Sequence, residues 1–309
     1  MQIYKMNQTK QTSPYHLFLL SWYNICVCHN HQTMKRILVP IDFSKTSEFA
    51  TKMASRIAKK SGADIYLLHM IELPTGIVDM GAGANFSIPE SMLYLRKIKE
   101  RLVEYKEKYF DSKTAVHHSI LFLHPYEGIE KYTKKINPDI IVMGSKGHSE
   151  FDEIIIGSNT EKVVRTSETP VLVVKKNERK FRIKNIVFAS DFANEEEKEV
   201  LRKVKVFADN FGSKIHLLKV NTPSNFESTY EARTSIQDYI KDINLDKYTV
   251  NIYSDVSIEK GILHFAQELD ADLISLCTHG RSGISHLFTS SVTKNLTKNA
   301  LKPMLTIRV

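Results

Sequence analysis

The chain has 309 residues, of which 42% are hydrophobic and 25% charged, proportions that exclude whole-chain disorder. It lacks a run of about 18 apolar residues, which argues against a transmembrane helix, and its three cysteines exclude a disulfide framework and favour a reducing compartment. The net charge is +8, but basic and acidic residues are mixed along the chain, so no nucleic-acid-binding stripe is indicated.

Residues 1–33 differ in composition from the rest of the chain. They contain no acidic residue, and they hold the only tryptophan. The apolar run 15–27 is interrupted by polar residues and lacks a small-x-small cleavage site, which argues against a secretory signal. A metal site formed by Cys26, Cys28 and the histidine that follows is disfavoured, because no second pair of ligands lies at the spacing that zinc sites use. We favour the interpretation that translation starts at Met34 and that 1–33 is a leader outside the fold.

The sequence repeats itself once. Four segments of the first half have counterparts in the second half. The matching pairs are 37–43 with 186–192, 64–69 with 214–219, 139–147 with 272–280, and 170–174 with 303–307. We therefore expect two domains of ordinary size, 34–177 and 181–309, joined by a short charged linker.

Short apolar runs alternate with amphipathic stretches in each half. The runs are nearly continuous, as in parallel strands that are covered on both faces. In the first half they are 37–41, 65–70, 119–123, 140–143 and 171–174. The repeated pattern of strand and helix predicts an α/β fold in which each half is doubly wound and Rossmann-like.

The first helix of each half carries start and stop signals. In the first half it is expected to begin near Ser44 and to end at Gly62, with apolar residues recurring on one face. In the second half, Asn194 is expected to cap an acidic first turn, 195–197, which suits the helix dipole, and Gly212 is expected to end the helix.

Open parallel sheets bind ligands beyond the carboxyl ends of their strands, where the winding reverses. Asp42 directly follows the first strand, and Gly144 and Gly147 follow the fourth. Gly157 and Ser158 open the next helix, whose free N–H groups form an anion site. A crevice with a carboxylate at one end and an anion site at the other suits a nucleotide.

Each of these residues also has a purely structural explanation. Asp42 could cap the first helix, and Gly144 could be only a strand-end turn. Ser158 and Glu161 match a capping box, which explains both residues without a ligand.

The sequence contains no convincing catalytic constellation. The loop after the first strand reads Pro-Ile-Asp-Phe-Ser, rather than the Ser-Gly-Gly-x-Asp of ATP pyrophosphatases. Cys277 is expected to be a buried, inert thiol. Histidines are expected to be structural or solvated rather than metal ligands at positions 69, 117, 118 and 124.

The pattern Gly144-x2-Gly147-x9-Gly157-Ser158 resembles the nucleotide motif of the universal stress proteins. The resemblance extends to segments 39–42, 139–144 and 170–174 and to the second half, so that it covers about residues 34–309 as a tandem pair. It implies a five-stranded parallel sheet of order 3-2-1-4-5 in each half, dimerisation through the last strand, and a stress-response role in the cytoplasm. Many members of this family bind ATP and others do not.

The same resemblance implies that the first half binds ATP, with or without Mg²⁺. Asp42 and Ile65 would lie near the adenosine, and Met143 and Gly144 beside the ribose and phosphates. The phosphates would be held by Gly147, Gly157, Ser158 and Asn159. The full expected set is Pro40, Ile41, Asp42, Ile65, Met143, Gly144, Gly147, Gly157, Ser158 and Asn159.

The second half departs from this pattern. Cys277 replaces the first glycine and Ser290 the third, and Lys294 stands in place of Glu161. Gly280 remains, with Ser291, Asp191 and Ile215. Because a Cβ at position 277 would obstruct the approach of a phosphate, we expect one ATP per chain.

The terminal strands of the two halves, 171–174 and 304–307, are equivalent and apolar. Since open apolar edges are usually covered, we expect them to pair, so that the halves form an intrachain pseudo-dimer; a homodimer is also possible. The sequence favours a nucleotide-binding regulatory protein. Two alternatives stay open, an interaction or scaffold protein without nucleotide and a weak ATPase or autophosphorylating protein.

Overall fold

The computed structural model describes residues 33–72, 88–145, 157–176, 183–278, 295–296, 300 and 302–309. Thr33–Val309 form one compact unit. Residues 1–32 lie outside the described residues, and with them Cys26 and Cys28. The same is true of Gly147, Gly280, Ser290, Ser291 and Lys294.

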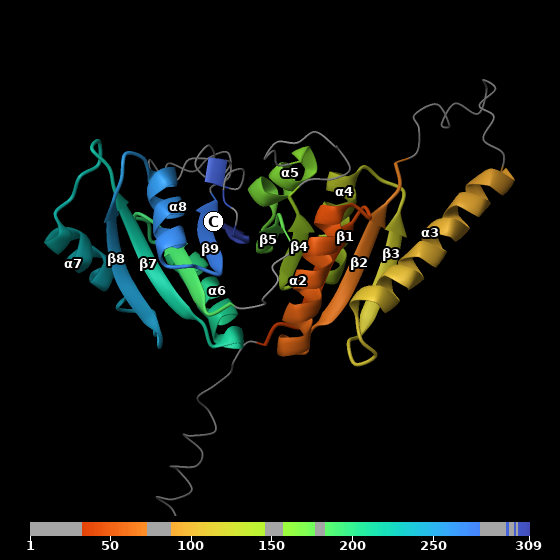
Figure 1. The fold of residues 1–309 in the computed structure, drawn as a ribbon, viewed down its shortest axis with the longest axis horizontal. Coiled ribbons are helices and arrows are strands. Elements are labelled where there is room, and N and C mark those ends of the chain that lie inside the picture. Colours follow the sequence, from red (N-terminus) through yellow and green to blue (C-terminus); the bar gives the residue numbers. More distant parts are fainter. Residues whose placement is uncertain are drawn as a thin grey trace, which may run out of the picture. The chain divides into compact units, whose positions relative to one another are not determined.

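The first half alternates strands and helices along the chain (Figure 1). Its elements are β1 (Arg36–Ile41), α2 (Lys45–Ser61), β2 (Asp64–Met70), α3 (Ile88–Tyr109), β3 (Val116–Leu121), α4 (Pro125–Ile136), β4 (Ile140–Gly144), α5 (Ser158–Thr166) and β5 (Val171–Val174).

The second half repeats this order over its described residues. Its elements are β6 (Asn185–Ala189), α6 (Glu196–Phe211), β7 (Lys214–Asn221), α7 (Thr229–Ile240), β8 (Tyr248–Ser254), α8 (Ile258–Glu268), β9 (Leu273–Thr278) and β10 (Met304–Arg308).

All ten strands form a single sheet of order β3-β2-β1-β4-β5-β10-β9-β6-β7-β8. Within each half the pairs are parallel and the order is 3-2-1-4-5, which confirms the predicted fold. The third predicted strand was placed too late in the sequence. Its apolar residues at 121–123 suggested a strand over 119–123, but β3 pairs with β2 only as far as Leu121, and Phe122 beyond it is 46% exposed.

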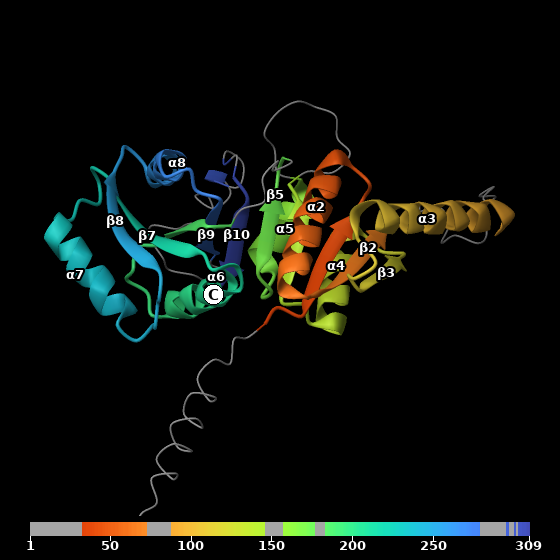
Figure 2. The same cartoon turned by 60° about the horizontal axis from the view of Figure 1, so that its bottom comes forward.

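The two halves meet where β5 and β10 pair antiparallel, side by side in Figure 2. Leu172 lies opposite Leu305, and both are buried. On the α2 side, the Lys60 ammonium donates a hydrogen bond to the carbonyl of Phe211 at 2.7 Å. The predicted intrachain pairing of the terminal strands is confirmed. Because each terminal strand is occupied by the other, a homodimer of this chain would need another surface.

Both faces of the sheet are covered, as the continuous apolar strands require. One core cluster joins the sheet to α2 and α3 and continues across the pairing of the halves to α6 and α7. On the other face, α4 and α5 pack over the first half and α8 over the second. None of the described helices is both long and apolar enough to cross a bilayer.

The helix starts and stops follow the expected signals with one difference. Ser44 caps α2, and Gly62 ends it in the left-handed conformation at a φ of 75°. Gly212 ends α6 in the same way. However, α6 begins at Glu196, and the Asn194 side chain accepts a hydrogen bond from the Glu196 N–H in the turn that precedes the helix.

Candidate functional site

A crevice of about 360 Å³ lies at the carboxyl ends of the adjacent strands β1 and β4. This is the point where the winding of the first half reverses, as the fold predicts for a ligand site. The crevice is lined by Pro40, Ile41, Asp42, Ser47, Met70, Pro125, Ile129, Met143, Gly144, Gly157, Ser158, Asn159 and Thr160. Eight of the ten residues expected from the sequence are therefore brought together.

Of the two remaining residues, Gly147 lies outside the described residues, and the placement of Ile65 was wrong. Ile65 is the second residue of β2, pairs with Ile37, and is fully buried in the core. Only the carboxyl ends of parallel strands reach the crevice. The β2 residue opposite Ile41 is His69, four positions and about 13 Å further along the strand.

Five lining residues were missed by the sequence analysis. Met70 comes from the end of β2, and the others from the first turns of three helices. A proline shortly after a strand, at the first position of a helix, is the signal that could have placed α4 here. The remaining four are Ser47, Pro125, Ile129 and Thr160.

Asp42 is held in place by its own loop. Its Oδ1 accepts a hydrogen bond from the Ser44 N–H at 2.9 Å. The N-cap of α2 is Ser44, whose Oγ accepts from the Ser47 N–H, so Asp42 is not the helix cap. Phe43, between them, has a φ of 63°, which turns the chain sharply from β1 into α2. This turn sets the Asp42 carboxylate at the edge of the crevice.

The first turn of α5 forms another part of the crevice wall. Gly157 is its N-cap, and no side chain caps the helix. The alternative explanation of Ser158 and Glu161 as a capping box does not hold, because Ser158 is already the first helical residue. The N–H groups of the first turn have no acceptor within the helix, and the positive end of the helix dipole lies here. This end of α5 is consequently open to an anion.

Two contacts fix this turn against the sheet. The Thr160 hydroxyl donates to the carbonyl of Gly144 at 2.9 Å, and the Gly157 N–H donates to the carbonyl of Ser145 at 2.7 Å. The Asn159 Oδ1 is buried and has no hydrogen-bond partner among the described residues. Turning the amide by 180° would instead present its two N–H donors there. An anionic ligand that accepts hydrogen bonds would satisfy this group, so the residues fit a bound phosphate.

Gly144 has a structural role that does not depend on a ligand. A Cβ at this position would lie 2.8 Å from the carbonyl carbon of Thr46, in the first turn of α2. The glycine therefore lets α2 pack directly on the end of β4.

We expect Gly144→Ala to lower the free energy of unfolding by about 1–3 kcal/mol, because a helix backbone must move to admit the methyl group. Urea denaturation would measure this, with Lys131→Ala on the exposed side of α4 as a control expected to change stability by less than about 0.5 kcal/mol. Equal unfolding midpoints for the two variants would contradict the packing argument.

The corresponding place in the second half is built differently. Cys277 lies beside Ile307 as Gly144 lies beside Val174, and it is 1% exposed. Burial raises the pKa of the Cys277 thiol, so the expected inert thiol is supported. The loop between Asp191 and α6 is two residues longer than the loop between Asp42 and α2.

Glu197 occupies the place of the crevice residue Ser47, since each lies fifteen residues before the glycine that ends its helix. Its side chain is fully buried and accepts a hydrogen bond from the Ser190 hydroxyl at 2.6 Å. Burial, with the nearby Asp191 carboxylate, raises the pKa of Glu197 to about 7. Glu197 lies in the acidic first turn predicted from the sequence, but its side chain is directed into the core.

The raised pKa makes a prediction about pH. Between the ordinary pKa of a glutamate and about 7, the folded state holds a proton that the unfolded state has released, so the stability contributed by Glu197 falls as pH rises, by up to about 1.4 kcal/mol per pH unit. Glu197→Gln lacks this titration. Urea denaturation should show the variant gaining stability relative to the wild type between pH 5 and pH 8. An unchanged difference between the two proteins would contradict the burial of this carboxyl group.

The histidine nearest the crevice is structural. His69 is buried, and its Nδ1 is 2.9 Å from the carbonyl oxygen of Ile41. Burial lowers its pKa, which keeps the ring neutral. Within the part of the chain that the structure describes, no three His, Cys, Asp or Glu side chains gather as a metal site would require.

Comparison with known proteins gives consistent matches along the chain. The model of the universal stress protein family matches residues 33–175 and 182–308. Universal stress protein MJ0577 of Methanocaldococcus jannaschii is 34% identical over 158 residues, covering 46% of this chain and 95% of that protein. Universal stress protein Slr1230 of Synechocystis is 22% identical over 302 residues, covering 89% of this chain and all of that protein.

A solved structure supports the arrangement of both halves. The crystal structure of a universal stress protein from Archaeoglobus fulgidus superposes with a TM-score of 0.65 at 21% identity, covering 88% of this chain and 96% of that one. At this identity the likeness concerns the fold. Because the family model matches both halves, the chain belongs to the universal stress protein family and carries two of its domains in tandem.

Proposed function

We propose that this protein is a regulatory protein of the stress response that binds ATP in the crevice of its first half. The observation that carries the proposal is the first turn of α5, which has no side-chain cap and faces a crevice with a carboxylate at its other side. The start of a helix favours a bound phosphate, because its N–H groups and dipole attract an anion. The Asp42 carboxylate disfavours a phosphate in its own neighbourhood, because the two groups carry like charges. The two ends of the crevice thus match the polarity of a nucleotide.

The proposed orientation follows from these charges. Ser158 and Asn159 would hold the phosphates through their backbone N–H groups and the Asn159 amide. Gly157, whose own N–H is bound to the Ser145 carbonyl, would let the phosphates approach the turn closely. Asp42 would face the adenosine, with Pro40 and Ile41 beside it, and Met143 would lie near the ribose. A Mg²⁺ ion, if present, would arrive with the phosphates, since the described residues offer no ready-made metal site.

We further propose that the second half does not bind ATP. In place of Ser47 it carries Glu197, and in place of Gly144 it carries Cys277 with a side chain. These residues put a carboxyl group and a thiol where the first half has a hydroxyl and no side chain, in addition to the aspartate that both halves carry, Asp42 and Asp191. We propose no hydrolytic step.

Mass spectrometry of the purified full chain tests the proposal and the scaffold alternative together. We expect ATP or ADP to be released on denaturation, or to be taken up when the protein is incubated with ATP, in preference to GTP. A protein that contains no nucleotide and takes up neither would support the scaffold alternative. Release of ADP from added ATP at a steady rate, lost in Gly157→Asp, would favour the weak ATPase.

A further inference from the structure

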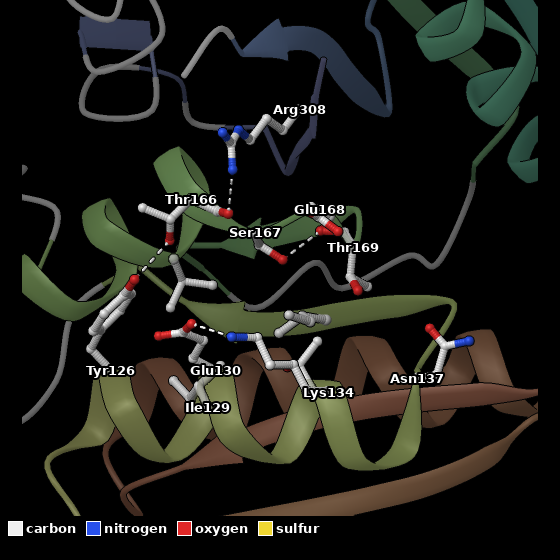
Figure 3. A pocket seen from close by; sticks show the side chains of 13 residues that line it. Tyr126, Ile129, Glu130, Lys134, Asn137, Thr166, Ser167, Glu168, Thr169 and Arg308 are labelled. Carbon is white, nitrogen blue, oxygen red and sulfur yellow. Dashed lines mark hydrogen bonds and ion pairs between the residues drawn. The ribbon is translucent and has the colours of Figure 1, made fainter. Parts of the chain in front are cut away.

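A second cavity, of about 380 Å³, lies between α4 and α5 at the ends remote from the crevice (Figure 3). Only Ile129 lines both sites. The cavity wall comes from α4, from Ile141 of β4, from α5 and the loop after it, and from one residue of the second half, Arg308 of β10. The site is therefore completed only by the pairing of the two halves.

Arg308 reaches over the end of α5. Its Nη1 donates a hydrogen bond to the carbonyl of Thr166 at 3.0 Å. Its Nε is buried and has no partner among the described residues. A guanidinium presents five donors in a rigid plane, so one carbonyl leaves most of them for another acceptor.

The α4 wall also carries a polar atom without a partner. The Thr133 Oγ1 is buried, and no described residue makes a hydrogen bond with it. Thr133 and Arg308 line the same cavity from different halves of the chain. Buried polar atoms without partners are rare in native proteins, and each calls for a ligand, a water or an ion.

The charges around the cavity are balanced but not all paired. Lys134 and Glu130 form an ion pair at 2.7 Å on α4, drawn as a dashed line in Figure 3. The other two charged residues of the cavity are Arg308 and Glu168, which are opposite in sign. The structure, over its described residues, shows no ion pair between these two side chains. A ligand with one negative and one positive group would complement both.

The floor of the cavity is apolar. It is formed by Ile129, Ile141 and Val163, each no more than 2% exposed. Because these side chains expose almost no surface to water, the gain on binding would come from the ligand's own hydrocarbon, at about 25 cal/mol for each Å² removed from water. The volume is sufficient for one small molecule of amino-acid size rather than for a peptide.

We propose that this cavity binds an aliphatic amino acid or a zwitterion of similar size and shape. Its carboxylate would accept hydrogen bonds from Arg308, its ammonium would face Glu168, and its aliphatic part would lie on the apolar floor. Thr133 would gain a hydrogen bond to the ligand. The inference is independent of nucleotide binding, because the crevice residues proposed for ATP do not contribute to this site.

Calorimetric and ligand-observed NMR titrations of the full chain would test this with leucine as the probe. Leucinamide keeps only the positive charge, and 4-methylpentanoate keeps only the negative one. We expect leucine to bind at least about 10-fold more tightly than either, since each charge-assisted hydrogen bond contributes about 1.5–3 kcal/mol.

Two variants separate the two charges. Arg308→Gln should remove the advantage of leucine over leucinamide, and Glu168→Gln should remove its advantage over 4-methylpentanoate. Thr133→Val keeps the shape of the side chain and deletes the hydroxyl, so it should weaken leucine binding several-fold without lowering the unfolding midpoint. Gly157→Asp should leave leucine binding unchanged.

Two results would overturn the proposal. One is the absence of leucine binding up to about 10 mM, which corresponds to less than about 3 kcal/mol of binding free energy. The other is leucine binding that is equally strong in Arg308→Gln, Glu168→Gln and Thr133→Val, which would place the ligand elsewhere. Neither result would affect the ATP proposal, which is tested at Gly157.

Discussion

The Gly157→Asp variant is expected to bind ATP at least about 100-fold more weakly than the wild type while remaining folded. The added carboxylate would stand at the N-cap of α5, where its oxygens can accept hydrogen bonds from the same N–H groups that would hold the phosphates. It would also add a negative charge beside them. Both effects act against a nucleotide triphosphate.

The same substitution should not damage the helix. Gly157 has a φ of −62° and a ψ of 143°, which any residue adopts without strain. Aspartate is among the best N-cap residues, and its charge suits the helix dipole, so the unfolding midpoint should stay equal or rise slightly.

Gly157→Asn is the matched control, because it has the same shape and capping ability without the charge. It should weaken ATP binding less than the aspartate does, and the difference between the two variants measures the charge effect. Calorimetric titration and thermal unfolding of the three proteins provide the data. If Gly157→Asp loses both binding and stability, the loss of binding would reflect unfolding, and the anion-site interpretation would lose its support.

The Leu305→Ala variant is expected to lower the free energy of unfolding by about 2–5 kcal/mol. Leu305 is 1% exposed and lies opposite Leu172 in the antiparallel pairing of β10 with β5. It belongs to the core cluster that runs across both halves, so the cavity left by truncation would lie where the two halves join.

Val309→Ala provides the control for this variant, because Val309 is the next residue after β10 and is 37% exposed. It should change stability by less than about 0.5 kcal/mol. Urea denaturation followed by both circular dichroism and fluorescence would compare them. Equal stability of the two variants would contradict the continuous core. Separate unfolding of the halves in Leu305→Ala would show that the pairing couples them.

Much of the fold could be predicted because the sequence contains an internal repeat and a regular alternation of apolar runs and amphipathic stretches. The internal repeat fixes two equivalent halves, and the continuous apolar runs fix parallel strands that are buried on both faces. The pairing of the terminal strands followed from their equivalence. The crevice at the ends of β1 and β4 followed from the strand order, which places Asp42 and the start of α5 together.

The errors have two physical causes. Sequence position does not show the direction of a side chain, and it does not show which end of a strand reaches the crevice. An acidic residue in the first turn of a helix is usually solvated, yet Glu197 points inward to Ser190. Ile65 lies in the correct strand but at its wrong end. Gly144 matches a ligand motif, but its missing Cβ is explained by packing against α2.

The second cavity could not have been found from the sequence. Arg308 lies 142 residues from Thr166 of α5, whose carbonyl it binds, and the antiparallel pairing of β5 and β10 brings them together. No local motif marks a site of this kind, because its parts come from two halves that are each complete folds.

The central claim is that a single nucleotide binds per chain, in the first half. Calorimetric titration of the wild-type protein with ATP tests this most directly, because it gives the stoichiometry and the affinity in one experiment. We expect a stoichiometry near one, and no measurable binding in Gly157→Asp. A stoichiometry near two, or binding that survives Gly157→Asp, would show that the second half carries a nucleotide despite Cys277 and Glu197.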